Sequence, residues 1–290
     1  MGPCLHVNMN TSGSRLGCCF GSIDKMNTKV RYNAAPLVLA LLEVRHPLAS
    51  LGTDASLSAL RESLRGTLPI YDPQSVSEME LNFVPGQDPA GRTRQTEIHV
   101  FRSRDKRTSL TIGPRSFSLE TSAYDGWAKF RDLLGVALTS RTAASEIDGV
   151  ERVGLRYIDE IRIPGAPGVS PSWGDWLHAS VVAPNPSELK LEVLQQQCVI
   201  QYRPEDPEDT LTLRYGAVNG PPAVNGPIRT EVPDDGHYFL LDTDAAWTPG
   251  TVPQYAPDEL LSVADRIHDC TQELFESVLT DRLRREVFNG

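Results

Sequence analysis

Charged residues crowd one short stretch near the middle of the chain, where acid–base chemistry or ligand binding could take place. Apolar and polar residues alternate over Arg152–Ile163, which is typical of a strand with one buried face. Asp159 falls in register with the apolar residues, so either a bulge shifts the register or a carboxylate points at the core face and needs partners. Neighbouring arginines could tune Asp159 and Glu160 for acid–base work or ligand binding. A structural ion pair that anchors a bulged strand is the more common reason for such a cluster.

Two tryptophans add to this candidate site. Trp173 and Trp176 lie in a short helical segment between loops, Ser172–Ser180, so they could line a ligand cavity. Core packing explains the other aromatic residues, among them Trp127 and Tyr157. The candidate ligand- or partner-binding residues are therefore Arg156, Asp159, Glu160, Arg162, Trp173 and Trp176.

A second group of cations lies in the first half of the chain, around a predicted hairpin. The group consists of Arg92, Arg94, Arg102, Arg104, Lys106, Arg107 and Arg115. The candidate anion-binding residues among them are Arg92, Arg94, Arg102, Arg104 and Arg107. Few aromatic residues are interleaved with these cations, which argues against nucleic-acid binding. A solvated hairpin edge that is protected by charge is the alternative explanation.

Motifs for nucleophilic, phosphate or metal chemistry are missing from the sequence. Neither GxSxG nor GxxxxGK[ST] occurs. His237, Asp242 and Asp244 lie close together on one predicted strand, but His237 has the opposite parity, so the three do not converge on a metal ion. We therefore predict no metal, no cofactor and no catalytic residue, although Ser, His and Asp residues could still assemble in space.

The composition bounds the class of protein. No apolar run approaches the roughly 18 residues that a membrane helix needs. The odd total of 5 cysteines and their scattered spacing argue against a disulfide framework, which predicts a reducing, cytoplasmic setting. The net charge of −10 disfavours binding to a phosphate backbone. The charge is uneven, because residues 26–148 hold 15 Lys and Arg against 14 Asp and Glu, whereas residues 149–290 hold 11 against 23.

Patterned segments predict the elements that would position these residues. Thr53-Asp54 is a plausible helix start, and an apolar stripe predicts a helix over Ala123–Leu138, which Ser122 could cap. The strongest helix prediction is Pro257–Val287, with proline in its first turn. The predicted strands are Ala40–Arg45, Met79–Phe83, Gln95–Phe101, Thr108–Ile112, Ser116–Leu119, Arg152–Ile163, Leu189–Arg203, Leu211–Gly216 and Tyr238–Asp242.

This order of elements appears twice along the chain. We predict an α+β fold of two pseudo-repeated β-α-β-β-β-α halves, residues 26–148 and 149–290, with antiparallel sheets and helices on one face. The arrangement resembles the TATA-binding-protein-like fold, and this analogy says nothing about DNA binding. Residues 1–25 are predicted to be a disordered extension, because they lack periodic apolar residues, and translation starts at Met1 or at Met26.

Several segments resemble a sporadically distributed bacterial family of somewhat shorter proteins with no assigned function. The segments are AAPLVLALLEVRHP (Ala34–Pro47), SAYDGWAKF (Ser122–Phe130), RVGLRYIDEIRIP (Arg152–Pro164), FLLDTD (Phe239–Asp244) and IHDCTQELF (Ile267–Phe275). The resemblance covers about Tyr32 to Phe288. Its most specific parts are GLRYI (Gly154–Ile158) and the spacing of Tyr124, Trp127 and Phe130. The resemblance implies no activity, cofactor or catalytic residue, and the scattered occurrence suggests mobile or defence-linked genes.

The sequence leaves three functions open. The leading hypothesis is a non-enzymatic binding or regulatory protein that engages a protein partner or a small ligand. The rival is an enzyme that acts on an anionic substrate such as a nucleotide or phosphate ester, with Asp159 or Glu160 as base. Nucleic-acid binding is the weakest of the three, and no membrane association is expected.

Overall fold

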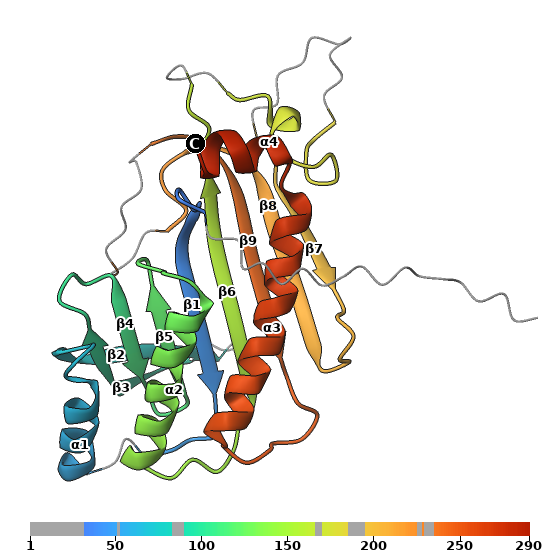
Figure 1. The fold of residues 1–290 in the computed structure, drawn as a ribbon. Helices are drawn as coiled ribbons and strands as arrows, with labels where there is room; N and C mark the ends of the chain where they lie inside the picture. Colours follow the sequence, from blue (N-terminus) through green and yellow to red (C-terminus); the bar gives the residue numbers. More distant parts are fainter. Residues whose placement is uncertain are drawn as a thin grey trace, which may run out of the picture. The chain divides into compact units, whose positions relative to one another are not determined.

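A nine-stranded antiparallel sheet organises the chain in the computed structural model (Figure 1). The structure describes residues 32–50, 53–82, 90–165, 170–184, 195–224, 228 and 235–290, with 78–82 and 90–94 described in backbone only. The predicted extension 1–25 lies outside these residues. The strand order across the sheet is β2-β3-β4-β5-β1-β6-β9-β8-β7. The strands are β1 (Leu37–Arg45), β2 (Ile70–Asn82), β3 (Ala90–Arg102), β4 (Thr108–Ile112), β5 (Ser116–Thr121), β6 (Arg152–Ile161), β7 (Cys198–Tyr202), β8 (Asp209–Gly220) and β9 (Gly236–Trp247).

The helices cover one face of this sheet. They are α1 (Asp54–Leu64), α2 (Trp127–Ala144), α3 (Pro257–Val278) and the single turn α4 (Asp281–Leu283), with η1 (Trp173–Asp175) and a terminal π-helical turn, η3 (Arg284–Phe288). Figure 1 shows α2 and α3 side by side in front of the sheet. The predicted α+β class with an antiparallel sheet and helices on one face is thus confirmed. No helix of the described residues is both long and apolar enough to cross a membrane.

The core between helices and sheet consists of two main apolar clusters. The first joins α1, α2 and the first part of α3 to β1, β5 and the start of β6. The second joins the end of α3, α4 and η3 to the ends of β6, β8 and β9. Every second residue of a strand points at the same face of the sheet, which explains why these residues face the helices. On β6, for example, Val153 and Leu155 belong to the first cluster and Ile161 to the second.

The two central strands come from different parts of the chain. β1 pairs with β5 on one side and with β6 on the other, and β6 pairs with β9. One sheet therefore runs through the predicted boundary at residues 148 and 149. The first part of the chain has four strands between its two helices, rather than the three of the predicted unit, and the single turn η1 is the one described helical element between β6 and β7.

Tertiary contacts shift several predicted element ends. α2 begins at Trp127, because Gly126, with φ 91°, forms the turn into the helix, so Ser122 does not cap it. The last helix starts at Pro257 as predicted but breaks after Val278. There His178 donates its N–H to the Val278 carbonyl at 2.9 Å, and Thr280 caps the next turn. The predicted helix Ser172–Ser180 reduces to Trp173–Asp175.

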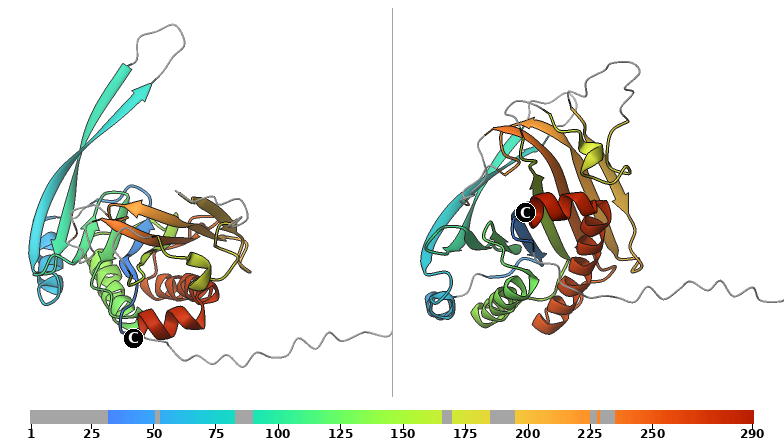
Figure 2. Two further views of the ribbon diagram at one scale, coloured as in Figure 1. Left: turned by 90° about the horizontal axis from the view of Figure 1, so that it is seen from above. Right: turned by 45° about the horizontal axis from the view of Figure 1, so that its top comes forward.

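Strands β2 and β3 run well beyond the sheet. They pair over 13 residues each, but β4 pairs only with His99–Arg102 of β3. The rest of the two strands therefore forms a two-stranded ribbon, which Figure 2 shows extending away from the helices. The strand predicted at Met79–Phe83 is the end of a much longer one, because β2 starts at Ile70, and Phe83 lies outside the described residues. β3 likewise starts at Ala90 rather than at the predicted Gln95.

Candidate functional site

Asp159 points at the helix-covered face, as its register predicted. β6 pairs with β9 without interruption from Val153 to Ile161, so β6 carries no bulge. The register shift lies in β1 instead, between Leu37 and Leu39, beside Asp159. The side chain is only 5% exposed. A regular strand thus carries a carboxyl group into the interior.

The described residues do not contain the partner that the sequence predicted for Asp159. Within the described residues, no arginine and no backbone N–H group donates a hydrogen bond to this carboxyl group. Burial, and secondly the negative charge of Asp242, raise the pKa of Asp159 to about 8. Asp159 is therefore mostly protonated at neutral pH.

Other polar groups lie at the same level of the core. The Tyr157 hydroxyl lies 3.0 Å from Nδ1 of His268 and 3.4 Å from the Tyr124 hydroxyl. Thr243 of β9 and Thr271 of α3 are buried as well. We call this set the polar belt: Tyr124, Tyr157, Asp159, Thr243, His268 and Thr271. Along β6, β9 and α3 it lies where residues of the first apolar cluster, Tyr157 among them, give way to those of the second.

Contacts between α2 and α3 position the side chains of the belt. The Trp127 ring stacks on His268 with centroids 4.2 Å apart, and its Nε1–H donates to Asp265 at 2.8 Å. Burial raises the pKa of Tyr124 to about 12, and raises that of Tyr157 well above its ordinary value. Both phenols therefore stay protonated and serve as hydrogen-bonding groups.

Sequence reasoning did not identify the polar belt. A signal was present, because the apolar stripes of three elements turn polar at one level. β6 changes at Asp159, β9 at Thr243 and α3 at His268 and Thr271. Only the strand register, which the sequence does not state, shows that these interruptions lie together.

The opposite face of the sheet, which no helix of the described residues covers, carries ion pairs beside a small apolar cluster on which Val224 and Ile228 pack. We call it the open face. Arg156 binds Asp242 through two hydrogen bonds of 2.7 Å, and Arg214 lies 3.7 Å from the same carboxylate. Arg152 bridges Glu43 and Asp244, at 3.2 Å each. We call this set the ion-pair array: Glu43, Arg45, Arg152, Arg156, Arg214, Asp242 and Asp244. Asp242 and Asp244 share a face, as predicted, and bind arginines. Within the described part of the chain, no group of three or more His, Cys, Asp or Glu is placed to hold a metal.

A glycine makes room within the ion-pair array. A Cβ atom added to Gly154 would lie 2.2 Å from Nη1 of Arg152. The arginine therefore lies across the glycine backbone on its way to Glu43 and Asp244. This contact gives a packing reason for the glycine in the GLRYI segment.

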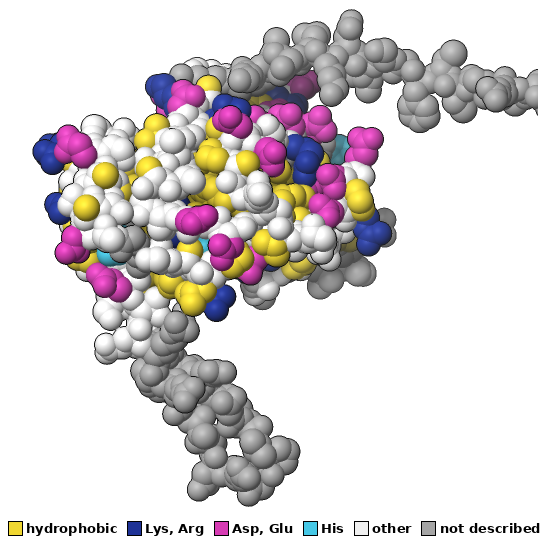
Figure 3. Space-filling view, turned by 90° about the horizontal axis from the view of Figure 1, so that it is seen from below, with side chains coloured by type: hydrophobic (Ala, Val, Ile, Leu, Met, Phe, Trp, Pro, Cys, Tyr) yellow, Lys and Arg dark blue, Asp and Glu magenta, His cyan; other side chains and the backbone are white. Residues whose placement is uncertain are grey.

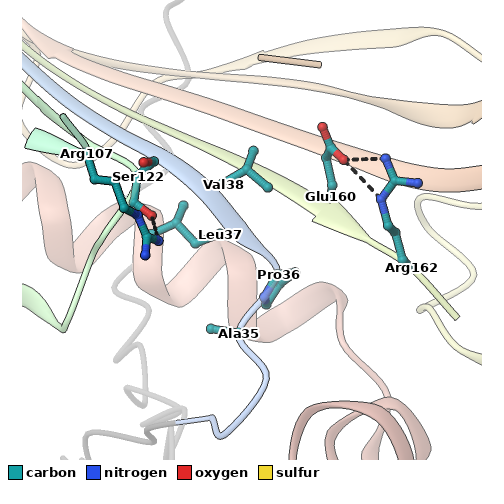
Figure 4. A pocket seen from close by; sticks show the side chains of 8 residues that line it. All are labelled: Ala35, Pro36, Leu37, Val38, Arg107, Ser122, Glu160 and Arg162. Carbon is teal, nitrogen blue, oxygen red and sulfur yellow. Dashed lines mark hydrogen bonds and ion pairs between the residues drawn. The ribbon is translucent and has the colours of Figure 1, made fainter. Parts of the chain in front are cut away.

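Glu160 faces away from Asp159. Its fully buried side chain pairs with Arg162 at 2.7 Å and accepts the N–H of Ala223 at 2.7 Å. Figure 4 shows this pair at one end of a pocket of about 240 Å³, with Arg107 and Ser122 at the other end and the start of β1 between them. The four predicted residues Arg156, Asp159, Glu160 and Arg162 therefore do not form one site.

The predicted anion-binding arginines also lie apart. Arg102 pairs with Asp72 on the open face, Arg104 is exposed in the turn after β3, and Arg107 donates to the Ser122 carbonyl beside the pocket. Arg92 and Arg94 lie in the ribbon, where only the backbone is described. Figure 3 shows acidic and basic side chains interspersed at the lower end of the molecule rather than gathered in one patch.

The two candidate tryptophans pack rather than line the pocket. Trp173 is buried in the second apolar cluster, with its ring 5.3 Å from that of Phe239. The guanidinium of Arg282 lies over the Trp176 ring at 4.0 Å. The bulk of both side chains therefore helps to fix η1 against β9 and α4.

Comparison with protein-family models gave no match, and comparison with curated proteins gave none either. A function therefore has to be inferred from the geometry of the described residues.

Proposed function

We propose that the protein is a non-enzymatic binding or regulatory protein that docks a protein partner on the open face of its sheet. The observation that carries this proposal is the ion-pair array. It spreads over β1, β6, β8 and β9, on the face opposite the helices. Arg45, Arg156 and Arg214 in it remain about half-exposed, so a partner can reach them.

The charge pattern of the array favours a protein partner over a nucleic acid. Each arginine of the array lies beside a carboxylate, such as Arg156 beside Asp242 and Arg152 beside Glu43. A phosphate backbone requires cations whose charge is not already balanced. A protein surface that carries both signs can match such an alternating pattern, which favours specificity and register.

The state of Asp159 supports binding rather than catalysis. This was the residue best placed in the sequence to act as a base. Its carboxyl group is enclosed by the helices and protonated at neutral pH, with a pKa raised to about 8 by burial. A buried acid without a hydrogen-bond partner among the described residues fits a role in the core better than proton abstraction from a substrate.

A small anionic ligand is the second candidate, and it would suit the rival enzyme as well. Guanidinium groups of Arg107 and Arg162 border the pocket of about 240 Å³. A carboxylate or phosphate group could bind between them. A nucleotide titration against wild type and Arg162→Gln tests this candidate, with unchanged affinity as the result that would exclude it.

The architectural and cellular parts of the hypothesis are proposals of the same kind. β1 and β6 lie side by side at the centre of the sheet. Each pairs on its other side with the last strand of its own half, β5 or β9. This arrangement supports an internal duplication with a TATA-binding-protein-like arrangement. Superposition of the two halves tests it. Membership in the scattered bacterial family, a link to defence or mobile genes, and a cytoplasmic setting follow from the resemblance and the cysteine pattern.

The binding proposal is tested with matched surface variants. Arg45→Gln/Arg214→Gln alters two exposed members of the array, whereas Arg282→Gln alters a comparably exposed arginine on α4. Proteins retained from a cell extract by the wild type are identified, purified and titrated against all three chains. The proposal expects binding to the wild type and to Arg282→Gln, with loss for the double variant. Equal affinity for all three chains would exclude the array as the docking surface.

A further inference from the structure

The ribbon of β2 and β3 leaves one backbone edge uncovered. β4 pairs with β3 only at His99–Arg102, whereas β2 pairs with β3 along its full length. Within the described residues, no strand pairs with Ala90–Ile98 on the side away from β2. This edge begins where β4 ends, at the corner between the sheet and the ribbon (Figure 2).

The hydrogen-bonding groups of this edge follow from the alternation of an antiparallel ladder. Ser103 donates its N–H to Thr108, which makes them a hydrogen-bonded pair of β3 and β4. Every second residue repeats this orientation, so His99, opposite Ile112, also directs its backbone toward β4. Continuing along β3 by two residues at a time, the N–H and C=O groups of Glu97 and then of Gln95 point to the same side, which is the uncovered edge.

The outer edge of the ribbon differs from this one. Pro73 of β2 lies opposite His99, where its missing N–H would point away from β3. A proline on an edge strand blocks the addition of another strand there. The stretch Ala90–Ile98 contains no proline. Pro73 therefore protects the outer edge only beside the sheet, because Gln74–Asn82, which lie opposite Ala90–Ile98, contain no proline either.

A hollow of mixed polarity lies at the start of the β3 edge. It has a volume of about 170 Å³ and is bordered by the apolar residues Leu48, Val76, Ile98 and Pro114 and by the polar residues Thr96, Arg115 and Ser116. Leu48 and Val76 are 53% and 40% exposed, so a partner can reach these aliphatic side chains. A strand that continued the line of β4 beyond Ile112 would lay one side chain over this hollow, because strand side chains alternate between the faces.

We propose that an extended segment of a partner protein adds to β3 as an antiparallel strand in line with β4. It would hydrogen-bond to the backbone of Gln95 and Glu97 and place an apolar side chain in the hollow, a mode known as β-augmentation. A two-stranded ribbon is only marginally stable alone, so a third strand would also order it. This inference rests on the proposed partner-binding function but uses a site distinct from the ion-pair array.

Two matched proline variants of the full chain test the inference. Glu97→Pro removes an N–H from the β3 edge and leaves pairing with β2 intact. Ser75→Pro is the control, because Ser75 lies opposite Glu97 and its N–H points to the outer edge of β2. Peptides selected on the wild-type chain from a random display library are titrated against all three proteins, once equal melting temperatures show that both variants fold.

The selected peptides should bind the wild type and Ser75→Pro equally, and Glu97→Pro at least about tenfold more weakly. Val76→Lys should weaken binding similarly, and it serves as the test if Glu97→Pro does not fold. Arg45→Gln/Arg214→Gln should bind these peptides normally, which separates this inference from the open-face proposal. Unchanged affinity for Glu97→Pro, or a library that yields no peptide, would overturn it. Self-association that Glu97→Pro abolishes would overturn it too, because a second copy would then occupy the edge.

Discussion

Two aspartates lie almost back to back on opposite faces of the sheet, and the protein treats them differently. Asp159 lies opposite Leu241, and Asp242 lies opposite Ile158, in the same pair of strands. Both are nearly buried, at 5% and 4% exposure. Asp242 binds Arg156 through two hydrogen bonds, whereas Asp159 has no such partner among the described residues. The Asp242 carboxyl group is thus paired with an arginine, whereas burial favours the protonated form of Asp159.

Arg141 extends the comparison to a cation on the helix-covered side. This side chain in the last turn of α2 is 1% exposed, and its Nε atom has no hydrogen-bond partner among the described residues. Its other nitrogens donate to the Ser145 hydroxyl and, at 3.4 Å, to the Ser50 carbonyl. Burial lowers the pKa of Arg141 from its ordinary value. Asp159 and Arg141 on this side thus lack a counterion among the described residues, whereas Asp209, also buried there, binds Arg266 of α3 through two hydrogen bonds of 2.8 Å.

The largest effect is expected for Asp159→Asn. The folded-state pKa of about 8 lies above the ordinary value of 3.8, so between these values the unfolded chain loses its proton while the native chain keeps it. Wild-type stability should therefore fall as pH rises from about 4 to about 8 and stay flat above. The variant lacks this slope. Its advantage in free energy of unfolding should grow from near zero at about pH 4 to an upper limit of roughly 5 kcal/mol at about pH 8. Urea unfolding at both pH values measures it, and a constant difference would contradict it.

Arg156→Met should break the pairing on the open face. It leaves the buried Asp242 carboxylate with only Arg214, at 3.7 Å. Removing one partner of a buried pair is strongly destabilising, but Arg156 is half-exposed, so we expect a loss of about 2 kcal/mol. Chemical denaturation checks the value. The double variant Arg156→Met/Asp242→Leu should recover most of the loss, and failure to recover would show that the pairing is not its cause.

Arg141→Met should behave in the opposite way. It removes a buried cation that has no carboxylate partner within the described part of the chain, together with its hydrogen bonds to the neutral groups of Ser145 and Ser50. Replacement of a poorly compensated buried charge by an apolar side chain is often neutral or stabilising, so stability should stay within about 1 kcal/mol of wild type or rise. A loss as large as that of Arg156→Met, in the same unfolding experiment, would remove the distinction between the faces.

Arg45→Gln should have the smallest effect. Arg45 is more than half-exposed and bonds Glu43, two residues away on the same strand, at 2.8 Å. Exposed pairs of this kind contribute roughly 0.5 kcal/mol or less. The melting temperature should stay almost unchanged. A marked drop in melting temperature would mean that even the exposed pair at the edge of the array stabilises the fold.

Local pattern was enough to predict the class of fold and the start of α3. Proline at the first position and acidic residues in the first turn define that start at Pro257. The end of α3 was not predictable in the same way, because it depends on a bridge between Leu177 and Leu279, far apart in sequence.

The candidate site was predicted only in part. Period-two alternation placed Asp159 on the core face, and the structure confirms this. The same alternation sends Arg156, Glu160 and Asp159 to two different faces, so nearness in sequence did not mean contact. The pairing of Arg156 with Asp242 depends on the register between β6 and β9, which no local pattern states. The extent of the ribbon was missed because Gly91 and the polar residues of β3 resemble a loop in composition.

The protonation of Asp159 tests the contrast between the two faces most directly. Side-chain carboxyl ¹³C shifts of aspartate-labelled protein can be followed with pH, and the resonance lost in Asp159→Asn assigns the group. The account predicts a midpoint near the folded-state pKa of about 8. A midpoint near the ordinary value of 3.8 would contradict it, because Asp159 would then be an ionised carboxylate with a partner or with access to water.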